Sequence, residues 1–156
     1  MKVGTDGTLL GAWTPVEQAQ NGTILDVGTG SGLIALMLAQ RCPEATILGI
    51  DADEAAAKQA TDNFALSKWS DRLTAKHISL QQLAQDETCF ASFDLIVSNP
   101  PYFVDSLKNP DHPRNGKRKP FGKNRTRGND LKNIGRTIIF LSPKGLVGRR
   151  SHIFNS

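Results

Sequence analysis

The chain has few cysteines and no long hydrophobic run, and both absences exclude classes of protein. Cys42 and Cys89 are the only cysteines in 156 residues, too far apart for a metal-binding spacing or a disulfide framework. No apolar stretch approaches the roughly 18 residues of a transmembrane helix, and MKVGTDGTLLGAW at the N-terminus lacks the apolar stretch of a signal peptide. We therefore expect a cytoplasmic protein with reduced thiols, no metal site and no membrane partner.

Acidic residues are almost absent from one end of the chain. Residues 114–156 contain twelve Lys/Arg and one acid, whereas residues 1–113 contain seven Lys/Arg and fourteen Asp/Glu. The net charge of +4 therefore combines an acidic body with a basic tail, GKRKPFGKNRTRG and beyond. Clustered cations release counterions from nucleic-acid phosphates. Two interpretations remain open: an arm that binds RNA, or a segment that does not belong to the fold.

Short apolar runs alternate with helix-forming stretches in the acidic body. We expect strands at 23–27, 45–50, 72–80 and 93–98, and helices at 33–41 and 53–66. The polar stretch at 81–87 fits a short helix or a loop. Such alternation predicts an α/β fold, with a parallel sheet and helices on both faces. Ligands of such sheets bind beyond the carboxyl ends of the strands.

A glycine-rich turn, DVGTGSG, follows the first expected strand. Gly28, Gly30 and Gly32 permit positive φ and close approach of a ligand to the backbone, and the next helix offers free N–H groups. The dinucleotide pattern G-x-G-x-x-G/A fails at Leu33 and survives only in a shifted, weaker form. Asp26 would repel a pyrophosphate but would attract a ligand that carries an ammonium group. A tight turn without a ligand is the alternative.

Two acids follow the second expected strand in the sequence IDAD. Asp51 is placed to accept hydrogen bonds from both ribose hydroxyls of an adenosine. Asp53 is better explained as the N-cap of the helix that begins there.

A third polar motif, SNPPY, ends the fourth expected strand. Two consecutive prolines end a strand and form a rigid turn behind Asn99. Tyr102 adds an aromatic ring. The motif thus places an amide and an aromatic side chain at the same edge of the sheet as the glycine turn.

These motifs resemble those of class I S-adenosylmethionine-dependent methyltransferases. D-x-G-x-G-x-G is similar to their motif I, an acid at the position of Asp51 is usual in the family, and N-P-P-Y matches motif IV of amino-methyltransferases. The resemblance implies a Rossmann-like fold with S-adenosyl-L-methionine as cofactor. It implies cofactor contacts from Asp26, Gly28, Gly30, Gly32, Asp51 and Ser79.

The chemistry of the reaction explains the residue types of motif IV. The lone pair of an adenine N6 is delocalised into the ring. The Asn99 side-chain oxygen and the Pro100 carbonyl can each accept one N6 hydrogen, which presents the lone pair for reaction. Tyr102 offers a face on which the base can stack. The resemblance therefore implies catalytic roles for Asn99, Pro100 and Tyr102.

Together with KVGTDGTLLGAW, these segments closely resemble the bacterial tRNA1(Val) (adenine-37-N6)-methyltransferase family over residues 1–113. The resemblance implies N6-methylation of an adenine next to the anticodon, tRNA as the partner, and a position for Thr5, Asp6 and Gly7 near the mouth of the site. From the residues alone, GTDG indicates only a turn. The sequence leaves the oligomeric state open, with a monomer as the expectation.

The chain departs from this family at two places. Ser79 stands where many relatives carry an acid, which removes a charge-assisted contact to the cofactor adenine; His77, nearby, is expected to be an ordinary strand residue. After residue 113 the family pattern is lost, although TIIFLSPKGLVG faintly resembles the segment leading to its fifth strand. We expect an incomplete core at 1–113, a poorly ordered tail at 114–156, and closing strands that are missing or altered. Truncation would leave the fourth strand at an exposed edge.

Three other functions remain open. Asn99 and Pro100 would serve equally for the glutamine amide of a protein such as a peptide-release factor, or for adenine in DNA. A catalytically inactive remnant would bind RNA through the tail. The cations available for that role are Lys117, Arg118, Lys119, Lys123, Arg125 and Arg127.

Overall fold

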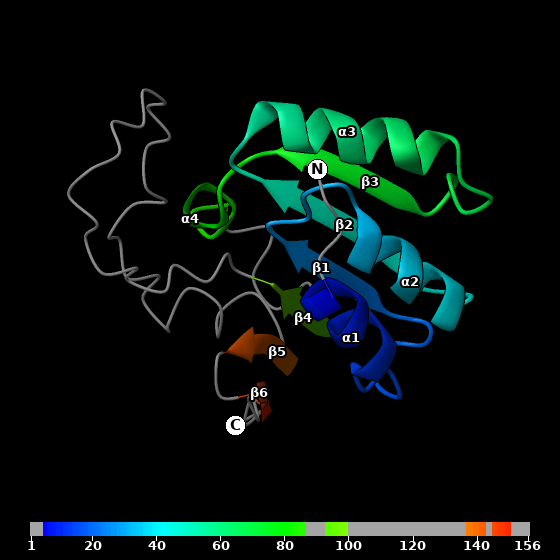
Figure 1. The fold of residues 1–156 in the computed structure, drawn as a ribbon, viewed down its shortest axis with the longest axis vertical. Coiled ribbons are helices and arrows are strands. Elements are labelled where there is room, and N and C mark those ends of the chain that lie inside the picture. The colour runs from blue at the N-terminus through cyan, green and yellow to red at the C-terminus, as the bar shows by residue number, and fades with distance from the viewer. Residues whose placement is uncertain (1–4, 87–92, 100–136, 143–144, 151–156) are drawn as a thin grey trace, which may run out of the picture.

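The computed structural model describes residues 5–86, 93–99, 137–142 and 145–150, the last two ranges as backbone only. Its six strands form one sheet in the order β3-β2-β1-β4-β5-β6 (Figure 1). The strands are β1 (Thr23–Val27), β2 (Thr46–Asp51), β3 (Leu73–His77), β4 (Leu95–Ser98), β5 (Thr137–Ser142) and β6 (Gly145–Arg150). The helices are α1 (Thr5–Trp13), α2 (Leu33–Arg41), α3 (Glu54–Ala65) and α4 (Leu80–Leu83).

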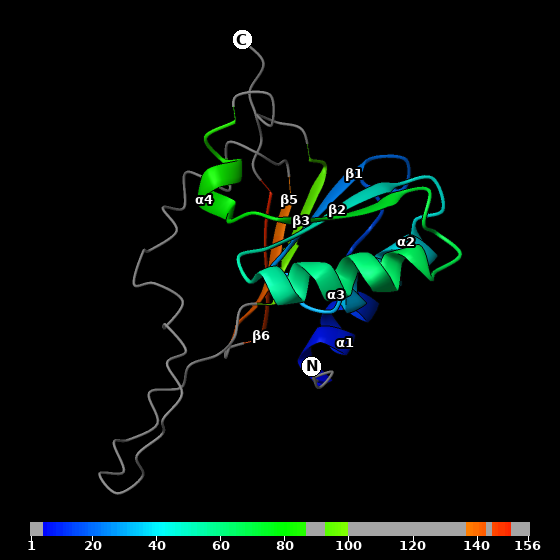
Figure 2. The same ribbon diagram turned by 90° about the horizontal axis from the view of Figure 1, so that it is seen from above.

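Three helices lie on one face of the sheet and α4 lies on the other, as Figure 2 shows. The path from β1 through β2 to β3 moves in one direction across the sheet, so right-handed crossovers place α2 and α3 on the same side. The path from β3 to β4 returns past β1, and its connection, which contains α4, therefore lies on the opposite side. The predicted parallel α/β fold with helices on both faces is confirmed.

The central strands are buried on both faces, which explains their continuous apolar sequences. Ile24 of β1 packs with α1, α2 and α3, whereas its neighbour Leu25 packs with Leu80 and Leu83 of α4. β4 alternates in the same way, and the side chains of Ile24, Leu25, Leu95, Ile96 and Val97 are at most 1% exposed. The two clusters hold the ends of β1 and β4 side by side.

Arg72, just before β3, ties the end of α2 to the sheet. Its guanidinium donates to the carbonyls of Ala39, Cys42 and Ala45 at distances of 2.8, 3.0 and 2.7 Å. Carbonyls at the end of a helix have no partner within the helix, so this side chain caps two of them, Ala39 and the C-cap Cys42, and its bond to Ala45 adds the turn before β2. The helix that follows the glycine turn is thereby fixed at its far end.

Helix α3 begins as the sequence predicts. The Asp53 carboxylate accepts from the Ala55 amide at 3.0 Å, so its role as N-cap is confirmed. The polar stretch after β3 contains the single turn α4. Among the described helices, none has the length and apolar content needed to cross a membrane.

The turn predicted for GTDG is wrong, because α1 already begins at Thr5. Glycine disfavours helix, but α1 buries Gly7, Leu10 and Gly11. A side chain at Gly11 would collide with Met37 of α2. Close packing between α1 and α2 therefore outweighs local propensity in this segment.

β4 is not the exposed edge that truncation before the closing strands would have left. β5 pairs in parallel with β4, with Ile96 opposite Ile138 and Ser98 opposite Phe140, and β6 closes the sheet in the antiparallel direction. Two stretches of the basic segment, 137–142 and 145–150, thus extend the sheet beyond β4 as its last two strands. The division into a core at 1–113 and a tail at 114–156 stays a prediction, since residues 100–136 lie outside the described residues.

Candidate active site

The three sequence motifs meet at the carboxyl edge of the sheet. Val27 of β1 lies opposite Ile50 of β2 on one side and Ser98 of β4 on the other. The residues that come next along the three strands are Gly28, Asp51 and Asn99, and each of them belongs to a different motif. This is the edge at which parallel sheets bind ligands, as the sequence predicts.

The glycine turn has the backbone conformation that its glycines permit. Gly28, Gly30 and Gly32 have φ of 73°, 59° and 82°, so the predicted positive φ is confirmed at all three. The amides of Gly28 and Thr29 donate to the Ile50 carbonyl at 2.8 and 3.0 Å, which ties the turn to β2. The turn is thus a fixed feature and does not depend on a ligand to hold it.

Two of these glycines differ in what a side chain would meet. A Cβ at Gly32 would collide with the Phe64 ring of α3, so Gly32 is needed for packing between the turn and α3. A Cβ at Gly28 would have no described heavy atom within 4 Å and would project into open space. The space above Gly28 is therefore available to a ligand that approaches the backbone.

Asp51 connects the turn to the end of β2. One carboxylate oxygen accepts from the Gly30 amide at 3.0 Å, and the other accepts from the Asp53 amide at 2.9 Å. Each oxygen has a further lone pair. The half-buried carboxylate is thus held in one orientation and still has capacity to accept hydroxyl donors, as a ribose would provide.

Asp26 is a buried carboxylate with one oxygen unpaired. Its side chain is 0% exposed, and the Thr29 hydroxyl donates to Oδ2 at 2.8 Å. Oδ1 has no hydrogen bond of good geometry among the described residues, although the backbone amide of Ala35, in the first turn of α2, interacts with the carboxyl and lowers its pKa. An unpaired buried acceptor is costly, and a cationic donor would satisfy it.

The pKa of Asp26 is raised from 3.8 to about 6, mainly because burial disfavours the charged form. The Thr29 hydroxyl and the Ala35 amide lower the pKa, and the charge of Asp51 raises it further. Because the folded-state pKa lies above the unfolded value, this group stabilises the fold most below pH 3.8, and the contribution is lost as the pH rises through about 6. The ionised carboxylate at neutral pH is therefore a local destabilisation that a bound cation would relieve.

Asn99 provides a second unpaired acceptor. It follows β4 and is half-buried, and its Oδ1 has no partner among the described residues. A Cβ built on Gly7 would lie 3.5 Å from Asn99 Nδ2 and 3.8 Å from Leu33 Cδ2. The first turn of α1 and the start of α2 thus flank the amide and leave its oxygen free to accept a hydrogen.

The other predicted site residues divide into three cases. Gly7 lies beside Asn99, whereas Thr5 and Asp6 are exposed at the start of α1. Ser79 donates to Gln82 Oε1 at 2.7 Å and accepts from the Gln82 amide at 3.2 Å, so its only hydroxyl proton is used in a capping box of α4. Pro100, Tyr102 and the cations of the tail lie outside the described residues.

Thr29 is a site residue that the sequence analysis missed. It is 6% exposed and hydrogen-bonds to Asp26, as described above. The only signal in the sequence is a hydroxyl three residues after an acid in a tight turn. His77 is an exposed strand residue, as expected, with its Nε2 3.2 Å from the Ala52 carbonyl. In the part of the chain that the structure describes, no cluster of three His, Cys, Asp or Glu could hold a metal ion.

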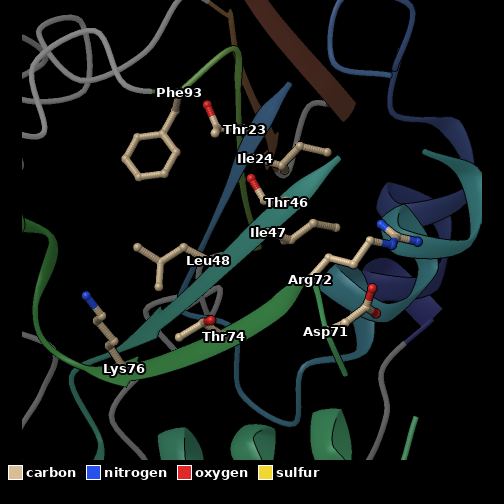
Figure 3. A pocket seen from close by; sticks show the side chains of 10 residues that line it. All are labelled: Thr23, Ile24, Thr46, Ile47, Leu48, Asp71, Arg72, Thr74, Lys76 and Phe93. Carbon is tan, nitrogen blue, oxygen red and sulfur yellow. The ribbon is translucent and has the colours of Figure 1, made fainter. Parts of the chain in front are cut away.

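A recess of about 280 Å³ lies elsewhere, on the face of the sheet that carries α4. Figure 3 shows its lining side chains, among them Leu48, Lys76 and Phe93. It contains none of the predicted site residues and opens over the first residues of β1 and β2. The candidate site is therefore the carboxyl edge and not this recess.

The chain is similar in sequence to methyltransferases. The family model described as "Methyltransferase small domain" matches residues 7–112. The chain is 55% identical over 118 residues to a tRNA1(Val) (adenine(37)-N6)-methyltransferase of Bacteroides thetaiotaomicron, covering 73% of the chain and 46% of the relative. It is 57% identical over 108 residues to the protein of that name from Proteus mirabilis, covering 69% and 41%. The chain thus spans less than half the length of these relatives.

The fold also matches solved structures. A protein from Methanococcus maripaludis, described as an S-adenosyl-L-methionine-dependent methyltransferase, aligns with a TM-score of 0.54 at 19% identity. The alignment covers 76% of this chain and 47% of that one. At this identity the match supports the fold alone.

Proposed function

The chain belongs to the methyltransferase small domain family, and we propose that it methylates the N6 atom of adenine 37 in a tRNA. The observation that carries the proposal is the unpaired Oδ1 of Asn99, at the end of the strand next to the glycine turn. The names of the relatives support tRNA as the acceptor. The cytoplasm follows as the compartment of the reaction.

The residues at the edge of the sheet fit S-adenosyl-L-methionine, which supplies an electrophilic methyl group on a sulfonium. Asp26 would attract its ammonium group, since the buried Oδ1 lacks a donor. Asp51 would accept from its ribose hydroxyls, and the open space above Gly28 would let it approach the backbone. Gly30 and Gly32 would shape the turn. Ser79 is the weakest member of the set, because its hydroxyl is used in capping α4.

The acceptor base would be held by the end of β4. The Asn99 Oδ1 and the Pro100 carbonyl would each accept one N6 hydrogen, which directs the nitrogen lone pair away from the ring. The two prolines would limit the motion of both acceptors, so that little reorganisation would be needed for reaction. Tyr102 would stack on the extruded base. No side-chain nucleophile takes part in this scheme.

Two other acceptors would use the same pair of hydrogen-bond acceptors: a protein glutamine amide and an adenine in DNA. A third possibility is an inactive RNA-binding chain that uses the basic tail. These alternatives differ in which molecule receives a methyl group, and in the inactive case none does.

A panel of acceptors tests the proposal. The chain is incubated with methyl-labelled S-adenosyl-L-methionine and, separately, with unmodified tRNA, duplex DNA and a peptide-release factor. We expect label in the tRNA only, and none in a matched tRNA in which guanine replaces adenine 37. Label in the protein or the DNA would establish one of the alternatives. A folded chain that binds tRNA in a salt-sensitive manner but labels nothing would establish the inactive RNA-binding chain.

A further inference from the structure

Thr29 lies within the glycine turn, and its side chain points at Asp26. We propose that Thr29 is a positioning residue that orients the Asp26 carboxylate, so that one of its oxygens faces a cationic ligand at the turn. The inference rests on the proposed function, because the cation in question is the ammonium group of the cofactor.

Thr29 is held from its backbone and from its side chain. Its amide donates to the Ile50 carbonyl at 3.0 Å, and its hydroxyl donates to Asp26 Oδ2 at 2.8 Å. A Cβ at Gly49 would lie 2.8 Å from the Thr29 hydroxyl oxygen, so the glycine in β2 makes room for this side chain. The hydroxyl is therefore confined to one position between β2 and the carboxylate.

This arrangement leaves one carboxylate oxygen for a ligand. A hydroxyl has one proton, and here it is given to Oδ2. Oδ1 has no described hydrogen-bond partner. Thr29 thus fixes which oxygen of Asp26 is satisfied by the protein and which one remains to accept from a cation.

The same hydrogen bond opposes the effect of burial. Of the groups that lower the pKa of Asp26, the Thr29 hydroxyl has the largest effect, followed by the backbone amide of Ala35 in α2. Asp51, at the end of β2, is the one charged group in the described part of the chain that acts on Asp26, and it raises the pKa. Removing the hydroxyl therefore leaves burial and the charge of Asp51 to favour the protonated, neutral acid.

The first experiment measures Asp26 without any ligand. Aspartate carboxyl carbons are followed by ¹³C NMR from pH 4 to 8, and Asp26→Asn identifies the resonance. In Thr29→Val, which keeps the shape and removes the donor, we expect the pKa to rise by about one unit. Thr29→Ser, which keeps the hydroxyl, should titrate near the unsubstituted chain. An unchanged pKa in Thr29→Val would overturn the inference whatever the function of the chain.

The second experiment follows the affinity for S-adenosyl-L-methionine by calorimetry across the same range of pH. For ionisation at about pH 6, raised by about one unit in Thr29→Val, the loss of affinity at pH 6 relative to the unsubstituted chain is about fivefold, and it largely disappears at pH 8. Thr29→Ser should restore the original profile, which a general loss of packing would not explain.

The two readouts separate the inference from the proposed function. A raised pKa together with an affinity that does not depend on pH would overturn the claim that Thr29 prepares Asp26 for a cation. If the chain did not bind S-adenosyl-L-methionine at any pH although Asp26 titrated as expected, the proposed cofactor would be contradicted instead. Thr29→Ala provides a second variant without the hydroxyl if Thr29→Val does not fold.

Discussion

Replacement of Asn99 by alanine is expected to lower the rate of methyl transfer to tRNA by about 100- to 1,000-fold, the effect usual for one preorganised group that acts in the transition state. The Asn99 Oδ1 is a buried acceptor without a partner, at the end of β4. Alanine removes this acceptor. Binding of S-adenosyl-L-methionine should change by no more than about twofold, because the substitution does not touch the turn or Asp51.

Single-turnover transfer and calorimetric titration measure these two quantities. Ser98→Ala is the matched control, since Ser98 precedes Asn99 and its hydroxyl donates to the Val27 carbonyl at 2.9 Å. It removes a hydrogen bond from the same strand end and should retain transfer within a few-fold. If Asn99→Ala kept most of its activity, the assignment of Asn99 as the group that holds the acceptor nitrogen would be wrong.

Gly28→Ala is expected to weaken the binding of S-adenosyl-L-methionine by about 30-fold or more, while it lowers the free energy of unfolding by only about 1–2 kcal/mol. A Cβ at Gly28 meets no described atom within 4 Å, so the stability cost is that of a positive φ of 73° in a residue with a side chain. The methyl group would instead occupy the space proposed for the ligand.

Gly32→Ala gives the contrasting case. It combines a φ of 82° with a collision against the Phe64 ring, so its free energy of unfolding should fall further, by about 1–3 kcal/mol beyond the backbone cost. Chemical denaturation and calorimetry of both variants separate the two effects. Unchanged affinity in a folded Gly28→Ala would show that the ligand does not approach the turn there.

Local patterns in the sequence were sufficient for the parts of the fold that depend on local interactions. The apolar runs located the first four strands, the glycines predicted the positive φ of the turn, and Asp53 was recognised as a helix cap. Parallel strands align their carboxyl ends, so the proximity of Gly28, Asp51 and Asn99 also followed from the sequence.

Features that depend on contacts between distant segments were not predicted. α1 contains glycines that disfavour helix, and packing against α2 stabilises it. The parallel pairing of β5 with β4 joins segments some forty residues apart in the sequence. The link between Thr29 and Asp26 and the contact of Gly7 with Asn99 depend on the placement of side chains. The capping box at Ser79 has a local signal, S-x-x-Q, although this serine was predicted only as a cofactor contact.

The most direct test of the account locates the methyl group on the product. Unmodified tRNA1(Val) is incubated with the chain and S-adenosyl-L-methionine, digested with nucleases, and analysed by mass spectrometry beside the product of Asn99→Ala. We expect N6-methyladenosine at position 37 with the unsubstituted chain and none with the variant. Methylation at another atom or position, or no methylation by a folded chain that binds both substrates, would contradict it.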